Sequence, residues 1–194
     1  MAHEMVVIGT SAGGLDAVCR LLRLLPADLR LSILVVQHRS PDSDALCDVL
    51  QDCSALPVHD VIDKEPIVPG NVYLAPPDYH VLVEEDHFSL TVDEPVAYSR
   101  PSIDVSLESA ADSWGRRLVG VVLTGANRDG ASGLRRVRDA GGIALVQTPA
   151  TAEVDIMPAA AAAAVPDAEL LTLEELAARL IQLTAAETAV RRPA

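Results

Sequence analysis

The stretch Val6-Val7-Ile8-Gly9-Thr10-Ser11-Ala12-Gly13-Gly14 decides the fold at the start of the chain, and an amphipathic run from Leu15 to Leu25 follows it. Apolar β-branched residues that lead into glycines, and then into leucines and a valine at helical spacing, predict a strand, a tight turn and a helix. Ser11 lies at the tip of this turn, where residues 9–13 spell G-x-S-x-G. Such a turn exposes a hydroxyl at the carboxyl end of a strand and directs helix N–H groups toward any ligand there.

Three interpretations of this turn stay open on the pattern alone. A serine in this setting can be a nucleophile, a glycine-rich first turn can hold a phosphate or dinucleotide, and the same residues can form a plain tight turn. The choice depends on which side chains the rest of the chain brings to Ser11.

The composition indicates one globular domain without a polyanionic partner. A chain of 194 residues can bury a sizeable core, and we expect residues 1–187 to form one catalytic domain, with a frayed tail at residues 188–194. Hydrophobic residues make up 49%, yet Phe and Trp occur once each, so the core must be aliphatic, as where helices cover a parallel sheet. The net charge of −13 argues against nucleic acid and anionic lipid as ligands.

The cysteines and the hydropathy place the chain in the cytoplasm. Cys19, Cys47 and Cys53 are odd in number and lack C-x-x-C spacing and a nearby histidine cluster, so we expect reduced thiols and no structural zinc. The first strand starts too early to leave room for a signal peptide, and no apolar run approaches about 20 residues, so we expect no membrane insertion. We also expect neither a metal nor another cofactor.

A second strand, Leu31 to Gln37, follows the first helix and ends at His38. A strand, a helix and a strand at this spacing form a βαβ unit with a right-handed crossover, so the two strands are parallel and end at the same edge. Ser11 and His38 therefore both lie at the edge where open α/β sheets bind ligands.

The rest of the chain predicts a doubly wound α/β fold with a mainly parallel sheet and helices on both faces. Short strands near residues 72–92 indicate an antiparallel hairpin insertion, and Ser102 is the natural cap of the helix that follows. The apolar run from Leu118 to Leu123 predicts a strand buried on both faces, and it leads into a glycine-rich loop that contains Asp129.

We expect further helices at residues 42–53, capped by Asp42 or Ser43, and after Pro158. A strand at residues 143–147 and a final amphipathic helix through Leu183 complete the chain.

Serine, histidine and aspartate would thus meet from three strand ends. A serine hydroxyl is a poor nucleophile at neutral pH, an imidazole can take its proton, and a carboxylate fixes the tautomer of the imidazole. Taken singly, His38 can be a solvated or capping residue and Asp129 can cap the next helix. The chain order Ser, His, Asp differs from that of the α/β-hydrolases.

Six motifs in register resemble the catalytic domain of the chemotaxis methylesterase CheB from about Met5 to Leu183. They are residues 7–14, VVQH at 35–38, EP with PGNVYLAP at 65–76, RPSID at 100–104, GVVLTG with DG at 120–130, and Gln147 with MP at 157–158. The resemblance implies a doubly wound fold and hydrolysis of glutamate γ-methyl esters on cytoplasmic helices of chemoreceptors. In some members it implies glutamine deamidation.

The family's catalytic serine, histidine and aspartate match Ser11, His38 and Asp129. The partner implied is a methyl-accepting chemoreceptor or a related signalling protein. The typical member also carries a receiver domain that these residues lack, so we expect a standalone esterase that is either unregulated or differently regulated and whose full activity needs no phosphodonor.

The departures from the family pattern gather around the three catalytic positions. Ala12 stands in place of a threonine, Ala126 in place of a methionine, Arg39-Ser40 in place of methionine-proline, and Asp155-Ile156 in place of an aromatic-glycine pair. The oxyanion site and the substrate loop implied by the family involve Ala12, Gly13, Ala126 and Met157. We expect an active enzyme with a diverged substrate groove.

Two further interpretations concern the surroundings of the site. Arg39 and Arg128 flank His38 and Asp129, so they can form a cationic rim that docks a Glu-rich helix, or can be solvated arginines. The rival to an esterase is a noncatalytic binding module, in which the turn at residues 9–14 holds a phosphate or a partner. A pure anion cradle needs no histidine and aspartate at two further strand ends.

Overall fold

A seven-stranded parallel sheet forms the centre of the molecule. The computed structural model describes residues 4–39 and 45–188, the last four by their backbone alone. The strands of this sheet are β1 (Met5–Thr10), β2 (Ser32–Gln37), β3 (Val58–Asp60), β4 (Val72–Leu74), β7 (Leu118–Val122), β8 (Ile143–Gln147) and β9 (Glu169–Leu171). Their order is β3-β4-β2-β1-β7-β8-β9, and every pairing is parallel. β1 is therefore central, with β2 and β7 at its sides.

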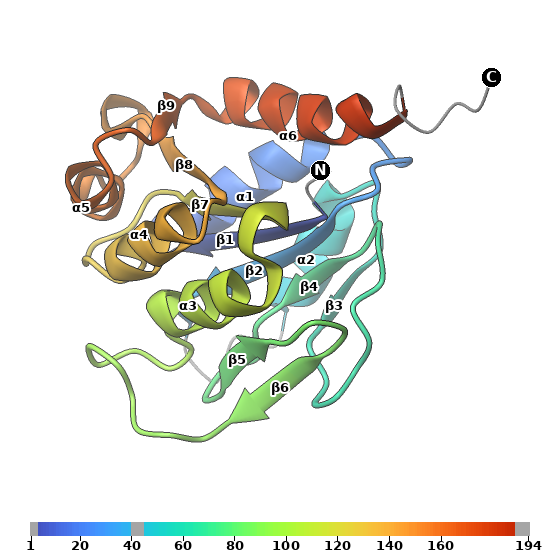
Figure 1. Cartoon of the computed structure of the whole chain (residues 1–194), viewed down its shortest axis with the longest axis horizontal. Helices are drawn as coiled ribbons and strands as arrows, with labels where there is room; N and C mark the ends of the chain where they lie inside the picture. Colours follow the sequence, from blue (N-terminus) through green and yellow to red (C-terminus); the bar gives the residue numbers. More distant parts are fainter. Residues whose placement is uncertain (1–3, 40–44, 189–194) are drawn as a thin grey trace.

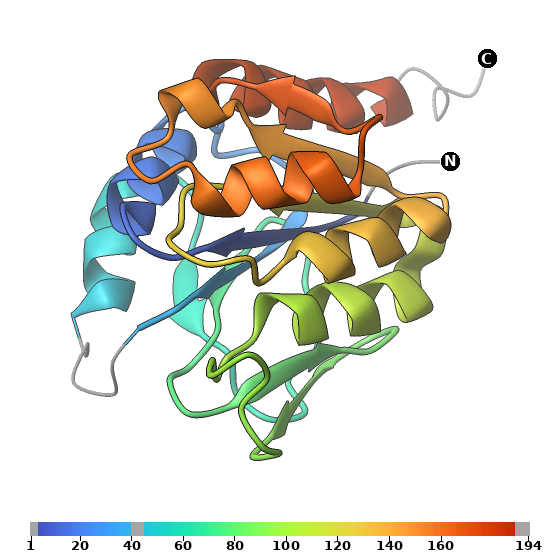
Figure 2. The same cartoon turned by 90° about the vertical axis from the view of Figure 1, so that its left-hand side faces the viewer.

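Helices cover both faces of this sheet (Figures 1 and 2), which confirms the predicted doubly wound architecture. They are α1 (Gly14–Arg23), α2 (Leu46–Cys53), α3 (Ile103–Trp114), α4 (Ala131–Asp139), α5 (Ile156–Ala164) and α6 (Leu173–Thr188), with short 3-10 turns at Gly115–Arg117 and Pro149–Thr151. None of these helices is long and apolar enough, within the residues described, to cross a bilayer.

Alternate residues of β1 serve two separate cores. Val6 and Ile8 pack in one aliphatic layer with side chains of α1, α2 and α6. Met5 and Val7 pack in the other, with side chains of α3, α4 and α5. The side-chain period of two in a strand thus buries β1 on both faces, and all six of its residues are buried.

The antiparallel hairpin lies within the insertion predicted near residues 72–92. It consists of β5 (His80–Val83) and β6 (Phe88–Thr91), and it lies beside α3 (Figure 1). In the same insertion, residues 72–74 form β4 and pair in parallel with β2 and β3. A three-residue apolar strand carries no signal of the direction of its partner, since the partner is distant in sequence.

The ends of the helices follow the predictions in part. Ser102 caps α3, because its Oγ accepts a hydrogen bond from the N–H of Val105 at 3.5 Å. α5 begins at Ile156, two residues before Pro158, since the first turn of a helix tolerates a proline without an N–H. The predicted caps Asp42 and Ser43 lie outside the described residues, as does the predicted tail apart from Thr188, the last residue of α6.

Candidate functional site

The turn after β1 holds Ser11 at the edge of the sheet. The N–H of Ser11 donates to the carbonyl of Thr124 at 3.0 Å, and the N–H of Gly14 donates to the carbonyl of Ser11 at 2.9 Å. Gly13 precedes α1 with a φ of 74°, a left-handed conformation that favours glycine. These contacts fix the backbone of Ser11 between the end of β7 and the start of α1, and they leave its side chain partly exposed.

Two backbone donors beside Ser11 are open. In the part of the chain that the structure describes, no hydrogen bond uses the N–H of Ala12 or of Gly13. Both groups belong to the N-terminal end of α1, where the partial positive charge of the helix favours an anion. Of the other two predicted loop residues, Ala126 is exposed, whereas Met157 is buried and packs on Gly125.

His38 lies opposite Ser11 at the same edge. Thr10 pairs with Gln37 in the parallel ladder of β1 and β2, so the next residues of the two strands are neighbours, and the N–H of His38 donates to the carbonyl of Thr10 at 3.2 Å. In the residues described, no hydrogen bond joins the hydroxyl of Ser11 to the imidazole.

Asp129 contacts the ring of His38 directly. Nε2 of His38 lies 2.8 Å from Oδ2 of Asp129, with the imidazole 14% exposed and the carboxylate fully buried. The structure therefore brings this histidine and this aspartate together from β2 and from the loop between β7 and α4. Because Nε2 faces the carboxylate, Nδ1 is the ring nitrogen that remains for a proton from elsewhere.

The N-terminus of α3 surrounds the Asp129 carboxylate. Its Oδ1 accepts from Ser102 Oγ at 3.0 Å and from the N–H of Asp104 at 2.9 Å, and its Oδ2 also accepts from the N–H of Ile103 at 2.7 Å. Burial by itself raises the pKa of Asp129, but the hydrogen bonds that the carboxylate accepts, first that from His38, outweigh burial and hold the pKa below its ordinary value. A charged carboxylate therefore faces His38 at neutral pH.

Asp104 makes a corresponding contact with the start of the next helix. Its Oδ1 accepts from the N–H groups of Gly130 and Gly133, at 2.9 and 2.7 Å, at the start of α4. Burial raises the pKa of Asp104 to about 6; the bond from Gly133 opposes the rise, and the Asp129 charge adds to it.

Asn127 is a member of the site that the sequence reasoning missed. Its Nδ2 lies 3.3 Å from Nδ1 of His38, and its Oδ1 accepts from the N–H of Asp129 at 3.1 Å. An Asn that bonds to the backbone two residues later is typical of turns, and this was the only signal available in the sequence.

The two arginines of the predicted rim differ in their surroundings. Arg39 is bound to Asp60 at 2.8 Å, and only 5% of its side chain is exposed, so little of it remains for a ligand. Arg128 is exposed on the loop that carries Asp129. The docking role of these residues stays a prediction, and it now applies mainly to Arg128.

A cleft of about 500 Å³ opens beside Ser11. Its walls include Leu15 of α1, Glu153 of the loop before α5, and the cysteines Cys19 and Cys53. Among the described residues, no group of three or more His, Cys, Asp or Glu side chains is arranged to hold a metal ion.

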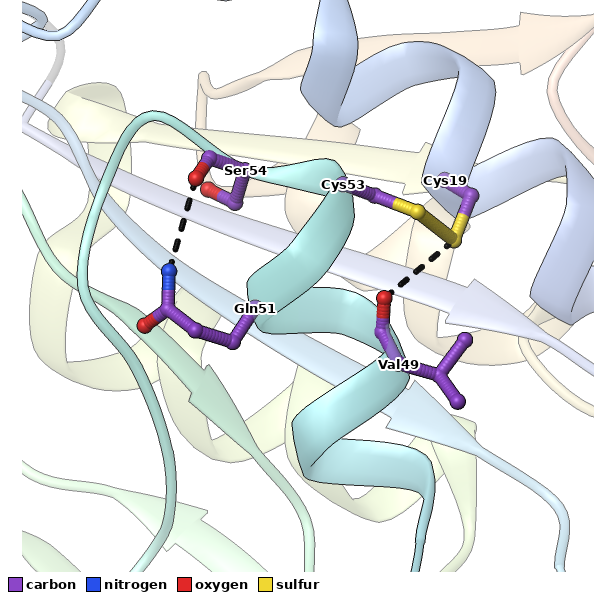
Figure 3. The surroundings of a disulfide bond; sticks show 5 residues. All are labelled: Cys19, Val49, Gln51, Cys53 and Ser54. Atoms are coloured by element: carbon purple, nitrogen blue, oxygen red, sulfur yellow. Dashed lines mark hydrogen bonds between the residues drawn. A yellow bond between two sulfur atoms is a disulfide. The ribbon is translucent and has the colours of Figure 1, made fainter.

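The expectation of three reduced thiols is wrong. Cys19 on α1 and Cys53 at the end of α2 form a disulfide across 34 residues, and the carbonyl oxygen of Val49 lies 3.9 Å from Cys19 Sγ (Figure 3). Cys47 is the free thiol, and burial raises its pKa. The sequence did not predict this disulfide, because the spacing of the cysteines does not reveal that α1 packs against α2.

Comparison with known proteins places this geometry in a family. A family model described as CheB methylesterase matches residues 6–180. The chain belongs to the CheB methylesterase family. It is therefore a hydrolase of the methylesterase class, with the fold and family predicted from the sequence.

Relatives and a solved structure agree with this assignment. A protein of Leptospira interrogans, named for protein-glutamate methylesterase and protein-glutamine glutaminase activities, is 43% identical over 94% of this chain and 96% of its own length. A protein-glutamate methylesterase/protein-glutamine glutaminase of Pseudomonas aeruginosa is 39% identical over 93% of this chain. The match covers 55% of that relative, so this chain spans about half of its length. The crystal structure of the Thermotoga maritima CheB methylesterase catalytic domain matches with a TM-score of 0.90 and 30% identity, over 94% of this chain and 100% of that one.

Proposed function

We propose that Ser11, His38 and Asp129 form a catalytic triad that hydrolyses γ-methyl esters of glutamate side chains and releases methanol. The observation that carries this proposal is the 2.8 Å contact between Nε2 of His38 and the fully buried carboxylate of Asp129, at the strand end next to Ser11. A buried carboxylate that faces an imidazole beside a serine is the arrangement that activates a serine hydroxyl. Family membership supports the same reaction.

The first half of the reaction forms an acyl-enzyme. Ser11 Oγ attacks the ester carbonyl carbon while Nδ1 of His38 takes the hydroxyl proton, and Asp129 stabilises the resulting imidazolium through Nε2. The tetrahedral intermediate collapses when the C–O bond to the methoxy group breaks. Methanol leaves with the proton that Nδ1 returns, and the glutamyl group stays on Ser11 as an ester.

The second half regenerates the enzyme. A water molecule loses a proton to Nδ1 of His38 and attacks the acyl carbon, and Ser11 leaves with that proton as the free hydroxyl, so that the product is a glutamate carboxylate. In both halves the developing oxyanion needs donors in fixed positions. The open N–H groups of Ala12 and Gly13 supply them, and neither depends on a side chain at position 12.

We assign the substrate to a methyl-accepting chemoreceptor or a related signalling protein in the cytoplasm, with residues 1–187 as one catalytic domain. The exposed Arg128 is the residue that would meet a Glu-rich helix at the rim. A glutamine side chain can follow the same route with ammonia as the leaving group, and the names of both relatives include glutaminase. A noncatalytic phosphate cradle explains the glycines at residues 9–14 but gives no role to the contact between His38 and Asp129.

The test of this proposal is methanol release from a helical peptide that carries glutamate γ-methyl ester. We expect the wild-type chain to release methanol and Ser11→Ala to lose roughly 10³-fold or more in kcat/KM. Ser132→Ala, which removes an exposed hydroxyl on α4, is the matched control and should keep wild-type activity. Methanol release by Ser11→Ala at the wild-type rate would contradict the proposal.

A further inference from the structure

Three hydrogen bonds form a closed ring around the imidazole of His38. The backbone N–H of Asp129 donates to Oδ1 of Asn127 at 3.1 Å, and Nδ2 of Asn127 lies 3.3 Å from Nδ1 of His38. Nε2 of His38 lies 2.8 Å from Oδ2 of the same Asp129. Each side chain of the ring thus has both its polar ends engaged.

The ring permits only one assignment of protons. A backbone N–H can only donate, so the Asn127 atom that faces it must be the amide oxygen. The other end of the amide is then an NH₂ group, which can only donate, so Nδ1 of His38 must accept and carry no proton. The proton of the neutral imidazole must therefore lie on Nε2, where it is donated to the Asp129 carboxylate.

This assignment gives Asn127 two effects on the base. The amide opposes protonation of Nδ1, because in an imidazolium the Nδ1–H and the amide NH₂ would be two donors facing each other. It also occupies the lone pair that Ser11 must use, since Nε2 is already bound to Asp129. Ser11 has no hydrogen bond to the ring in the described residues, so its hydroxyl can donate to Nδ1 only where the amide releases that nitrogen.

We infer that Asn127 is a positioning residue of the esterase: its amide holds His38 in the proton-accepting tautomer at rest and yields Nδ1 to Ser11 during the reaction. The catalytic consequence rests on the proposed function, whereas the state of the imidazole does not. The side chain at position 127 therefore decides whether Nδ1 faces a hydrogen-bond donor at rest.

Other charges near His38 stay constant when only Asn127 is changed. They are Asp129 against Nε2, Asp104 at the start of α3, Arg128 on the loop before α4, and the Arg39–Asp60 pair that joins the end of β2 to β3. Differences in the titration midpoint between variants at position 127 therefore arise from the side chain at that position.

The test compares Asn127→Ala with Asn127→Asp by ¹⁵N NMR of the His38 ring in the full chain without substrate. The alanine variant loses the donor, so the midpoint of the ring titration should rise by about 0.5 to 1 pH unit. The aspartate variant keeps an oxygen for the N–H of Asp129 but faces Nδ1 with a second carboxylate, so the midpoint should rise by about 1 to 3 units. Asn71→Ala, in the turn before β4, is the matched control and should leave the midpoint unchanged.

The outcomes separate this inference from the proposed function. A merely structural Asn127 predicts that the isosteric aspartate resembles the wild type more than alanine does, and that result, or equal midpoints in all chains, would overturn the inference. The acid limb of kcat/KM for a glutamyl γ-methyl ester should move by the same amounts in the same order. If the midpoints shift as expected but no chain hydrolyses the ester, the proposed function fails and the hydrogen-bonded ring stands.

Discussion

At the scale of single residues, two carboxylates beside the site each accept hydrogen bonds from the N-terminus of the other's neighbouring helix. Asp129 precedes α4 and accepts N–H groups from the start of α3, while Asp104 in α3 accepts N–H groups from the start of α4. The two differ in pKa, because burial raises the pKa of Asp104 to about 6, whereas the hydrogen bonds to Asp129 together outweigh burial and hold its pKa below the ordinary value. These contacts fix the two helices relative to each other and orient the carboxylate that faces His38.

The raised pKa of Asp104 predicts how Asp104→Asn changes stability with pH. A raised pKa in the folded state favours the protonated form, so this group stabilises the fold fully below about pH 4, and the stabilisation is lost as the pH rises through about 6. The asparagine keeps an Oδ1 for the N–H groups of Gly130 and Gly133 and stays neutral.

Relative to the wild type, Asp104→Asn should therefore gain about 1.4 kcal/mol of stability as the pH rises from 5 to 7.5, roughly half of the about 3 kcal/mol expected over the whole titration. Urea unfolding at both pH values measures this difference. A difference between the two proteins that is the same at both values would show that Asp104 does not titrate in this range.

The sequence predicted Ser11, His38 and Asp129 as a group because each follows a strand, and parallel strands bring their carboxyl ends to one edge. The structure joins His38 to Asp129, which agrees with that argument. Asn127 could not be predicted in the same way, because its role depends on the direction of an amide within a turn. Neither residue type nor spacing encodes that direction.

At the scale of the elements, a disulfide ties together the helices that follow the strand ends of Ser11 and His38. α1 begins at Gly14, directly after the serine turn, and α2 follows β2 and the residues after His38. Cys19 and Cys53 join these two helices (Figure 3). Both cysteines also line the cleft beside Ser11, so this bond stabilises one wall of the cleft.

Loss of this disulfide should reduce stability. Closing a loop between residues 34 apart restricts the unfolded chain and is worth about 3 to 4 kcal/mol on the chain-entropy model. The double variant Cys19→Ser/Cys53→Ser should lose that much free energy of unfolding relative to the oxidised wild type, and the difference should shrink when both are measured with a dithiol reductant. Cys47→Ser is the matched control. Equal stability of the wild type with and without reductant would argue against the bond.

The predicted elements were reliable in their positions, and the pairing of short strands was left open. The strand at residues 118–122 and the helix after Ser102 appear where the sequence predicted them. The partner of β4 could not be predicted, because its three residues Val72–Leu74 are apolar in either kind of pairing. The pairing of cysteines failed for a related reason, since it depends on a contact between helices.

At the scale of the whole molecule, the order of the strands assembles the site. β1 is central, and its neighbours β2 and β7 carry His38 and lead to Asp129. Three residues spread over more than a hundred positions therefore lie at one edge of the sheet, beside the open N–H groups of Ala12 and Gly13, and the start of α3 donates to the Asp129 carboxylate. The helices on both faces hold this edge through two aliphatic cores.

The proposed catalysis requires Ser11 to be a nucleophile that His38 activates, and covalent labelling with a fluorophosphonate probe tests this most directly. Peptide mapping by mass spectrometry should locate a single adduct on Ser11 in the wild-type chain and none in Ser11→Ala. His38→Ala should react roughly 10³-fold more slowly or worse, because the hydroxyl then lacks its base. Labelling of Ser11→Ala at the wild-type rate, or an adduct that maps to another serine, would contradict the account.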